Sequence, residues 1–95
     1  MSLKNNAQAG TFESSDILVL VEPVPENTGR IIELTSTVDI HYADSIKSVI
    51  NKVLDELTIN DIKITAKDKG ALDATIAARV ETAVKRSLGI QEGTL

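Results

Sequence analysis

The chain contains no cysteine, no tryptophan and a single histidine. Without cysteine there can be no disulfide, no thiolate metal site and no cysteine nucleophile, so any thiol chemistry would have to come from a cofactor. One histidine excludes a zinc site built from several histidines. One Phe and one Tyr are the only aromatic residues. We therefore expect an aliphatic core and no stacking platform for nucleic-acid bases.

The charge balance and the hydrophobic runs exclude two further classes of partner. The formal net charge is −4, and an acidic domain is repelled by phosphate backbones, so we predict no nucleic-acid partner. No apolar run approaches the ~20 residues needed to cross a bilayer. The first nine residues lack the apolar stretch of a signal peptide. These features predict a cytoplasmic protein without a membrane partner.

With 95 residues, the chain has material for one small domain. Residues 1–8 are mostly polar and are predicted to form a flexible N-terminus. The folded domain is expected over residues 9–90, and residues 91–95 are predicted to be a C-terminal tail. We find no internal repeat, linker or low-complexity segment.

Two strands are predicted in the first third of the chain. The continuous aliphatic run at residues 17–21 indicates a strand, and Pro23 and Pro25 end it because proline donates no hydrogen bond. Residues 26–29 have turn chemistry, and residues 30–35 alternate like a second strand. We expect these two strands to pair as an antiparallel hairpin.

Two amphipathic helices and a third strand follow. The first helix is predicted to begin between Val38 and Ser45, and the second to end at Gly89. The strand lies between them, where Ile62, Ile64 and Ala66 alternate with polar residues. Apolar stripes at helical spacing define the helices, with these members: Ile46, Val49, Ile50, Val53, Leu54 and Leu57 in the first, and Leu72, Ile76, Val80, Ala83, Val84 and Ser87 in the second.

The predicted order of elements is strand, strand, helix, strand, helix. This order predicts an α+β fold, a small two-layer sandwich with both helices on one face of an antiparallel or mixed sheet of three to four strands.

The sequence offers no catalytic constellation and no metal site. His41 lacks the partners of a general base, and the acid pairs Asp39/Asp44 and Asp55/Glu56 do not follow the spacing of a calcium loop. A solvated helix face explains those pairs. Residues 67–70 could contact a phosphate ahead of a helix, but a lone glycine is weak support for that and an ordinary turn is the preferred explanation. The basic side chains of Arg79, Lys85 and Arg86 need no role beyond the polar face of a helix.

The segment at residues 9–16, Ala-Gly-Thr-Phe-Glu-Ser-Ser-Asp, is hydroxyl-rich and precedes the first predicted strand. A serine that carries a covalent group needs small neighbours, exposure and access for a modifying enzyme. An ordinary loop would have the same composition.

This segment resembles the A-G-T-L-E-S-G-D stretch of the citrate lyase acyl carrier proteins, the gamma chains of that enzyme. Residues 68–73 resemble the D-K-G-A-L-D motif of that family, and residues 78–81 resemble its A-R-x-E continuation. The resemblance implies that Ser14 carries 2'-(5''-phosphoribosyl)-3'-dephospho-CoA through a phosphodiester. Ser15 stands where the family often has Gly and is the fallback attachment site. Lys69, Gly70 and Asp73 are then candidate contacts of the arm or of a partner, or they only shape the turn and the helix start.

The resemblance also implies the partners and the chemistry. A transferase, the holo-carrier synthase, would attach the arm to Ser14 with release of pyrophosphate, and citrate lyase ligase would acetylate the terminal thiol. The alpha subunit would exchange acetyl for citryl, and the beta subunit would cleave citryl to oxaloacetate and regenerate the acetyl form. The chain itself would be a non-catalytic carrier.

Three alternatives stay open from the sequence. The chain could serve a citramalate lyase or a malonate decarboxylase, which use the same type of arm. It could be a cofactor-free interaction module. A stand-alone enzyme is disfavoured, because nucleophile–base pairs and metal ligands are missing.

Overall fold

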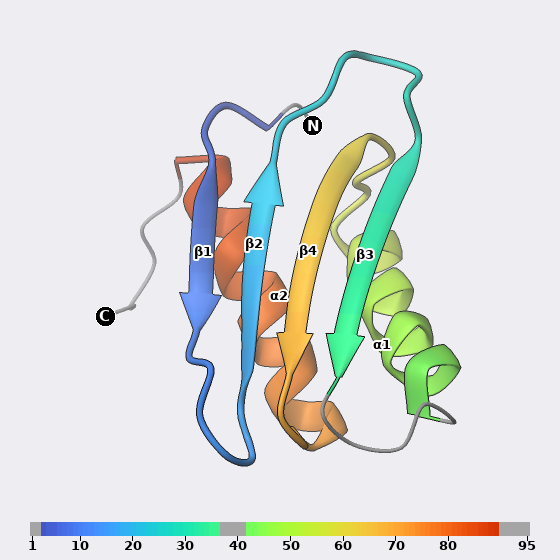
Figure 1. Ribbon diagram of the computed structural model, residues 1–95. Helices are drawn as coiled ribbons and strands as arrows, with labels where there is room; N and C mark the ends of the chain where they lie inside the picture. The colour runs from blue at the N-terminus through green and yellow to red at the C-terminus, as the bar shows by residue number, and fades with distance from the viewer. Residues whose placement is uncertain (1–2, 37–41, 90–95) are drawn as a thin grey trace.

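A computed structural model describes residues 3–36 and 42–89 of the chain (Figure 1). Their helices and strands follow in this order: β1 (Ala7–Gly10), β2 (Ile17–Glu22), β3 (Arg30–Ser36), α1 (Ala43–Glu56), β4 (Ile62–Asp68) and α2 (Asp73–Ser87). The predicted α+β class and the order from β2 onward are confirmed. No helix in these two ranges is long and apolar enough to cross a membrane.

The strands form one mixed sheet in the order β1-β2-β4-β3. β1 pairs antiparallel with β2, and β2 pairs antiparallel with β4. β3 and β4 run parallel, with α1 connecting them. As a result, the β1–β2 turn, the β4–α2 turn, the end of β3 and the start of α1 all lie at one end of the molecule, the lower end in Figure 1.

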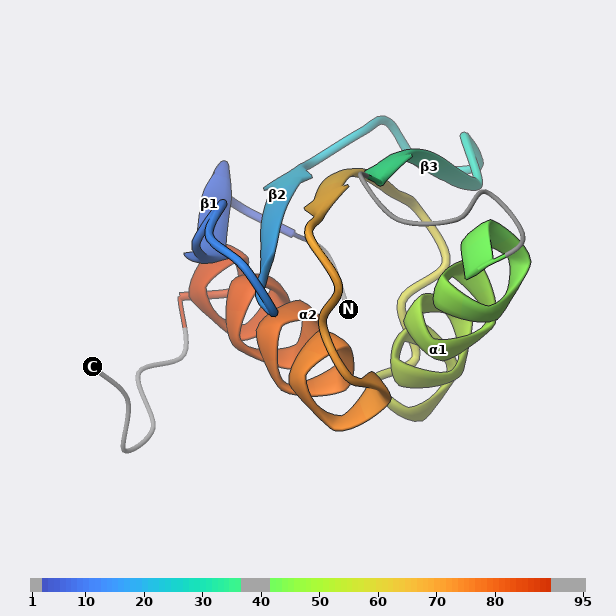
Figure 2. The ribbon, with the colours of Figure 1, turned by 60° about the horizontal axis from the view of Figure 1, so that its bottom comes forward.

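Both helices cover the same face of the sheet, as Figure 2 shows, and they pack against each other. α2 lies against β1 and β2, while α1 contacts β3. The buried hydrophobic side chains of the described residues are all Ala, Val, Leu or Ile. The predicted aliphatic core is therefore confirmed, and alternate residues of β2 and β4 point into it.

The predicted hairpin between residues 17–21 and 30–35 is wrong, because β4 lies between these two strands. β4 buries Ile62, Ile64, Ala66 and Asp68, which suits a central strand with neighbours on both sides. The connection at residues 23–29 is long enough to pass across the end of β4. The hairpin partner of β2 is instead β1, which the sequence did not identify as a strand.

The boundary predicted between residues 8 and 9 falls inside β1. The backbone N–H groups of Lys4 and Asn5 also donate to the Ser87 carbonyl, at 3.0 and 3.1 Å. Leu3 packs against the core. The N-terminal segment from residue 3 onward is thus attached to the end of α2. The C-terminal tail at residues 91–95 lies outside the described residues.

Arg30, at the start of β3, fixes the connection between α1 and β4. Its guanidinium donates twice to the Ile59 carbonyl, at 2.9 and 2.7 Å, and once to the Asn51 side chain at 3.2 Å. It also pairs with Asp55 at 2.8 Å. Arg30 thereby satisfies a carbonyl just beyond the helix and ties the helix to the sheet edge.

Candidate functional site

Ser14 lies at the tip of the turn between β1 and β2. The Asp16 N–H donates to the Glu13 carbonyl at 3.1 Å, which closes a four-residue turn with Ser14 and Ser15 at its centre. Ser15 adopts a φ of 64°, in the left-handed region. Glycine takes this conformation without steric cost. This explains in physical terms why the related motif often has Gly where this chain has Ser15.

The two serines differ in how firmly the turn holds them. Both are exposed, and neither hydroxyl forms a hydrogen bond within the described part of the chain. The Ser15 N–H, however, donates to the Lys69 carbonyl at 2.8 Å. No such backbone bond holds Ser14. The backbone of Ser15 is therefore held to the neighbouring turn, whereas both hydroxyls are exposed.

Gly10 lets the chain enter this turn. Its φ is +89°, and a Cβ atom at this position would lie 1.9 Å from the Ile17 carbonyl oxygen. That oxygen belongs to the backbone of the adjacent strand and cannot move aside without breaking the pairing. Only glycine fits here, so the glycine of the first motif has a structural role.

Asp16 anchors the other end of the turn. Its carboxylate accepts hydrogen bonds from the Thr11 hydroxyl at 2.7 Å, the Ile17 N–H at 2.7 Å, and the Arg79 guanidinium at 3.2 and 3.1 Å. Burial raises the pKa of Asp16, but these donors and the Arg79 charge outweigh burial and lower the pKa from 3.8 to about 2. Asp16 therefore stays ionised and holds the two ends of the turn together at neutral pH.

The second motif forms the turn between β4 and α2. Asp68 is 1% exposed and accepts hydrogen bonds from the N–H groups of Gly70 and Ala71 at 3.1 and 3.0 Å, and from the Ser36 hydroxyl at 3.0 Å. The backbone donors that could have held a phosphate are thus occupied by a carboxylate of the chain itself. The interpretation of residues 67–70 as an ordinary turn is supported, although neither Asp68 nor Asp73 forms a side-chain cap on α2.

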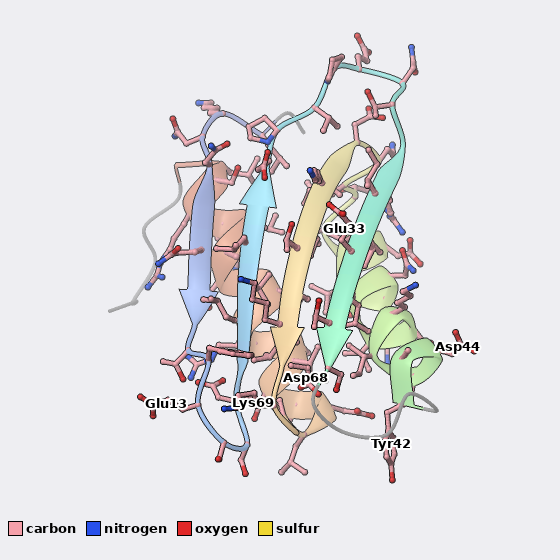
Figure 3. All side chains as sticks on the ribbon, in the orientation of Figure 1. Glu13, Glu33, Tyr42, Asp44, Asp68 and Lys69 are labelled. Carbon is pink, nitrogen blue, oxygen red and sulfur yellow. The ribbon has the colours of Figure 1, made fainter. Side chains whose placement is uncertain are left out.

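The two turns lie side by side. The Lys69 N–H donates to the Asp16 carbonyl at 3.0 Å, next to the bond from Ser15 to Lys69. The Lys69 ammonium lies 4.8 Å from the centroid of the Phe12 ring, within the range of a cation–π contact. Figure 3 shows Glu13 and Lys69 at the same end of the molecule. Residues that the sequence separates by more than fifty positions therefore form one surface around Ser14.

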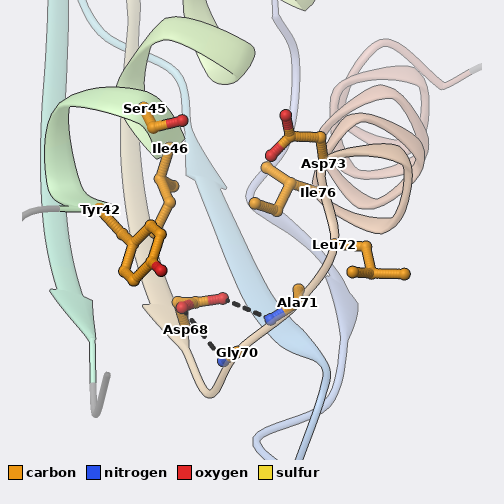
Figure 4. A pocket seen from close by; sticks show the side chains of 9 residues that line it. All are labelled: Tyr42, Ser45, Ile46, Asp68, Gly70, Ala71, Leu72, Asp73 and Ile76. Carbon is orange, nitrogen blue, oxygen red and sulfur yellow. Dashed lines mark hydrogen bonds between the residues drawn. The ribbon is translucent and has the colours of Figure 1, made fainter. Parts of the chain in front are cut away.

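A pocket opens next to this surface, between the first turns of α1 and α2 (Figure 4). Its volume is about 290 Å³. It is lined by Ser45 of α1 and by Tyr42 just before that helix, by Asp73 of α2 and by Leu72 just before that helix, and by Gly70 of the β4–α2 turn. Leu72 is 75% exposed, so a large apolar side chain stands at the rim.

The structure shows that one residue predicted to lie in the core does not, and it shows the partners of three basic side chains. Leu72 precedes α2 in an extended conformation, with φ −73° and ψ 157°, so it does not continue the buried stripe. Arg79 binds Asp16, Lys85 pairs with Glu81 at 2.9 Å, and Arg86 donates to the Gln8 carbonyl at 2.8 Å. Arg79 and Arg86 thus fasten α2 to the N-terminal part of the chain, a role that their helical spacing did not predict, whereas the Lys85–Glu81 pair lies within α2.

The other candidate residues of the sequence divide into three groups, one of which, Asp44, Asp55 and Glu56, lies on α1. Ser14, Ser15, Lys69, Gly70 and Asp73 all lie at the end that carries the two turns. His41 and Asp39 lie outside the described residues. Within residues 3–36 and 42–89, no three His, Cys, Asp or Glu side chains are grouped so that they could hold a metal ion.

Comparison with known proteins decides the family. The family model described as malonate decarboxylase delta subunit (MdcD) matches residues 4–87. The citrate lyase acyl carrier protein of Latilactobacillus sakei is 44% identical over 97% of this chain and 89% of the relative. The chain belongs to the citrate lyase acyl carrier protein family. Two other members, from Clostridium perfringens and Halothermothrix orenii, are 45% and 41% identical over 97% of this chain and cover 90% and 97% of their own lengths.

A solved structure has the same fold as this acyl carrier protein. It is a Pseudomonas malonate decarboxylase hetero-tetramer in complex with malonate, and the match has a TM-score of 0.72 over 90% of this chain and 87% of that chain. The sequence identity is 22%, so this likeness concerns the fold alone. The relatives are acyl carrier proteins, and family membership makes this chain a carrier rather than a catalyst.

Proposed function

We propose that this chain is the acyl carrier subunit of a citrate lyase, with 2'-(5''-phosphoribosyl)-3'-dephospho-CoA attached through a phosphodiester to the Ser14 oxygen. The observation that carries this proposal is the position of Ser14: an exposed, unbonded hydroxyl at the tip of a turn that is fixed at its base. Identity of 40–45% to citrate lyase carriers over nearly the whole chain supports the choice of enzyme.

The site has the chemical group that such an attachment needs. A phosphodiester needs one accessible hydroxyl, and the chain offers it without a competing hydrogen bond. For attachment, the Ser14 oxygen would attack the phosphorus of an activated triphosphoribosyl precursor. A new oxygen–phosphorus bond forms, pyrophosphate leaves, and the hydroxyl proton passes to the transferase or to water. When bound, the arm supplies the terminal thiol that the chain lacks and carries acetyl and citryl groups as thioesters.

The residues around Ser14 hold its turn in place. Asp16 and Arg79 fix the base of the turn, and Lys69 bonds to it from the neighbouring turn. A fixed base with an exposed tip lets the arm move between active sites while its origin stays constant, which keeps the acyl group at high effective concentration. The proposed partners are the alpha and beta subunits of the lyase, the transferase and the ligase.

The enzymes that could use this carrier differ in their large subunits. The name of the matching family model favours a malonate decarboxylase carrier as the second candidate, whereas the sequence identity favours citrate lyase. A citramalate lyase would use the same carrier chemistry. Reconstitution with citrate lyase alpha and beta subunits, followed by a citrate cleavage assay, would separate these possibilities.

The attachment site is tested by co-expressing the chain with the transferase and its precursor-forming enzyme. We expect a mass increment equal to the arm in the wild type and in Ser15→Ala, and none in Ser14→Ala. If Ser14→Ala is still modified, the attachment site is Ser15 instead. If the wild type stays unmodified beside an active transferase, the chain is a cofactor-free interaction module instead.

A further inference from the structure

The pocket between α1 and α2 lies immediately beside the turn that carries Ser14. Ser15 is hydrogen bonded to Lys69, and the next residue, Gly70, borders the pocket. The path from the proposed attachment residue to the pocket thus consists of one hydrogen bond and two peptide units. A flexible group that starts at Ser14 has this pocket within reach. This argument rests on the proposed function.

The pocket has room for the end of such an arm and not for the whole of it. Its volume of about 290 Å³ is at the lower limit for small-molecule sites, which span roughly 300–1,000 Å³. Figure 4 shows the Tyr42 ring and the Leu72 side chain on opposite sides of the opening. Both side chains are largely exposed, at 58% and 75%. These two side chains provide an apolar rim that an uncharged group can contact.

The charges of the side chains that line the pocket determine which forms of the arm can bind there. Among residues 3–36 and 42–89, the ionisable side chains that line the pocket are Tyr42, Asp68 and Asp73, and no Lys or Arg of these ranges lines it. Asp68 accepts three hydrogen bonds from donors of the chain, and these stabilise its carboxylate without a positively charged ligand. The N-termini of α1 and α2 favour anions, but each already has an acidic side chain in its first turn, Asp44 and Asp73. A further anionic group is therefore disfavoured, whereas an uncharged thiol or acetyl thioester is not.

We propose that this pocket holds the uncharged end of the arm, either the free thiol or its acetyl thioester, between visits to the partner subunits, and that it rejects the citryl form. A citryl thioester carries free carboxylates, which the Asp68 and Asp73 side chains disfavour. The carrier would thereby shield the reactive thioester from water between visits, and the citryl arm, once formed at the alpha subunit, would not return to the pocket.

The test uses the isolated holo carrier, confirmed by mass to be modified on Ser14. The rate at which its thiol reacts with 5,5'-dithiobis(2-nitrobenzoate) is compared with that of free coenzyme A. If the arm occupies the pocket about nine-tenths of the time, we expect roughly tenfold slower reaction. Leu72→Asp should bring the rate close to that of coenzyme A. Ile31→Asp is the matched control, because Ile31 is also exposed, at 41%, but lies on β3 and not in the pocket.

A second readout locates the arm without any enzyme activity. Amide chemical shifts of Ser45, Gly70 and Leu72 should differ between the apo chain and the holo chain with a free or acetylated thiol. In the citryl form they should return to the apo values. The proposal requires both results: an unprotected thiol, equal rates in the two variants, or unchanged shifts at these amides would overturn it. A chain that the transferase fails to modify would instead overturn the proposed function.

Discussion

Asp16 and Arg79, which lie 63 positions apart in the sequence, form a two-point ion pair with nitrogen–oxygen distances of 3.2 and 3.1 Å. Asp16 ends the motif that carries Ser14, and Arg79 belongs to the motif in α2. The pair therefore fastens the turn of the proposed attachment serine to a helix of the core. A geometry with two parallel hydrogen bonds is specific to Arg and gives both strength and orientation.

The Asp16–Arg79 pair should make the free energy of unfolding depend on pH in the acidic range. The pKa of Asp16 is lowered in the folded chain, from 3.8 to about 2. A lowered pKa contributes stability that is fully present above pH 4 and is lost as the pH falls towards 2. Asp16→Asn should therefore be less stable than the wild type at pH 7, by up to about 2 kcal/mol. Urea titrations between pH 2 and pH 7 should show the two chains converging at the acid end.

A double-mutant cycle can separate the contribution of this ion pair to stability from the contributions of neighbouring interactions. Arg79→Gln and Asp16→Asn should each destabilise the chain, and the double variant should lose less than the sum. Strict additivity of the two changes in unfolding free energy would mean that the ion pair contributes nothing.

Ser15 occupies a backbone conformation that suits glycine. Because its φ is 64°, Ser15→Gly should stabilise the chain by about 1 kcal/mol, which thermal unfolding would detect. Ser14, whose φ is not positive, provides the control, and Ser14→Gly should bring no gain. Mass analysis after co-expression with the transferase should find Ser15→Gly fully modified. A destabilised Ser15→Gly would contradict the described turn.

Gly10 and Gly29 form a matched pair for the entry to the turn. Both have positive φ, +89° and +86°, but only Gly10 faces a backbone oxygen, whereas nothing lies within 4 Å of a Cβ at Gly29. Gly29→Ala should cost about 1–2 kcal/mol from the backbone conformation alone. Gly10→Ala should cost several kcal/mol more or prevent folding, as measured by urea denaturation. Equal losses in the two variants would show that β1 and β2 are not joined as described.

Val53 tests the packing of α1 on the core. It is 8% exposed, and Val53→Asp would bury an unpaired charge at a cost of several kcal/mol, more than a small domain can spare. Ser48→Asp, on the exposed side of the same helix, should change the unfolding free energy by less than about 1 kcal/mol. A Val53→Asp chain with an unchanged melting temperature would rule out this assignment of the helix face.

The helices and strands from β2 onward could be predicted, whereas the order of strands in the sheet could not. Periodicity shows which face of a strand is buried but does not show its neighbour. The predicted hairpin of β2 with β3 was wrong for this reason. β1 was missed because its four residues, Ala-Gln-Ala-Gly, have little of the branched or aromatic character that marks a strand.

The site could be predicted as two motifs but not as one surface. The resemblance pointed to Ser14 and to residues 68–73, and the structure places them side by side. The contacts that join them, from Asp16 to Arg79 and from Phe12 to Lys69, connect distant parts of the chain, and no local spacing encodes them. Leu72 followed the helical spacing of the stripe, but it precedes the helix and points away from the core.

The central claim is that Ser14 carries a covalent thiol arm. Its most direct test is intact-mass spectrometry with peptide mapping of the chain purified from its native host grown under citrate-fermenting conditions. We predict an increment equal to phosphoribosyl-dephospho-coenzyme A, located on the peptide that contains Ser14 and on the Ser14 oxygen within it. An unmodified chain from cells that are shown to contain the transferase would contradict the claim.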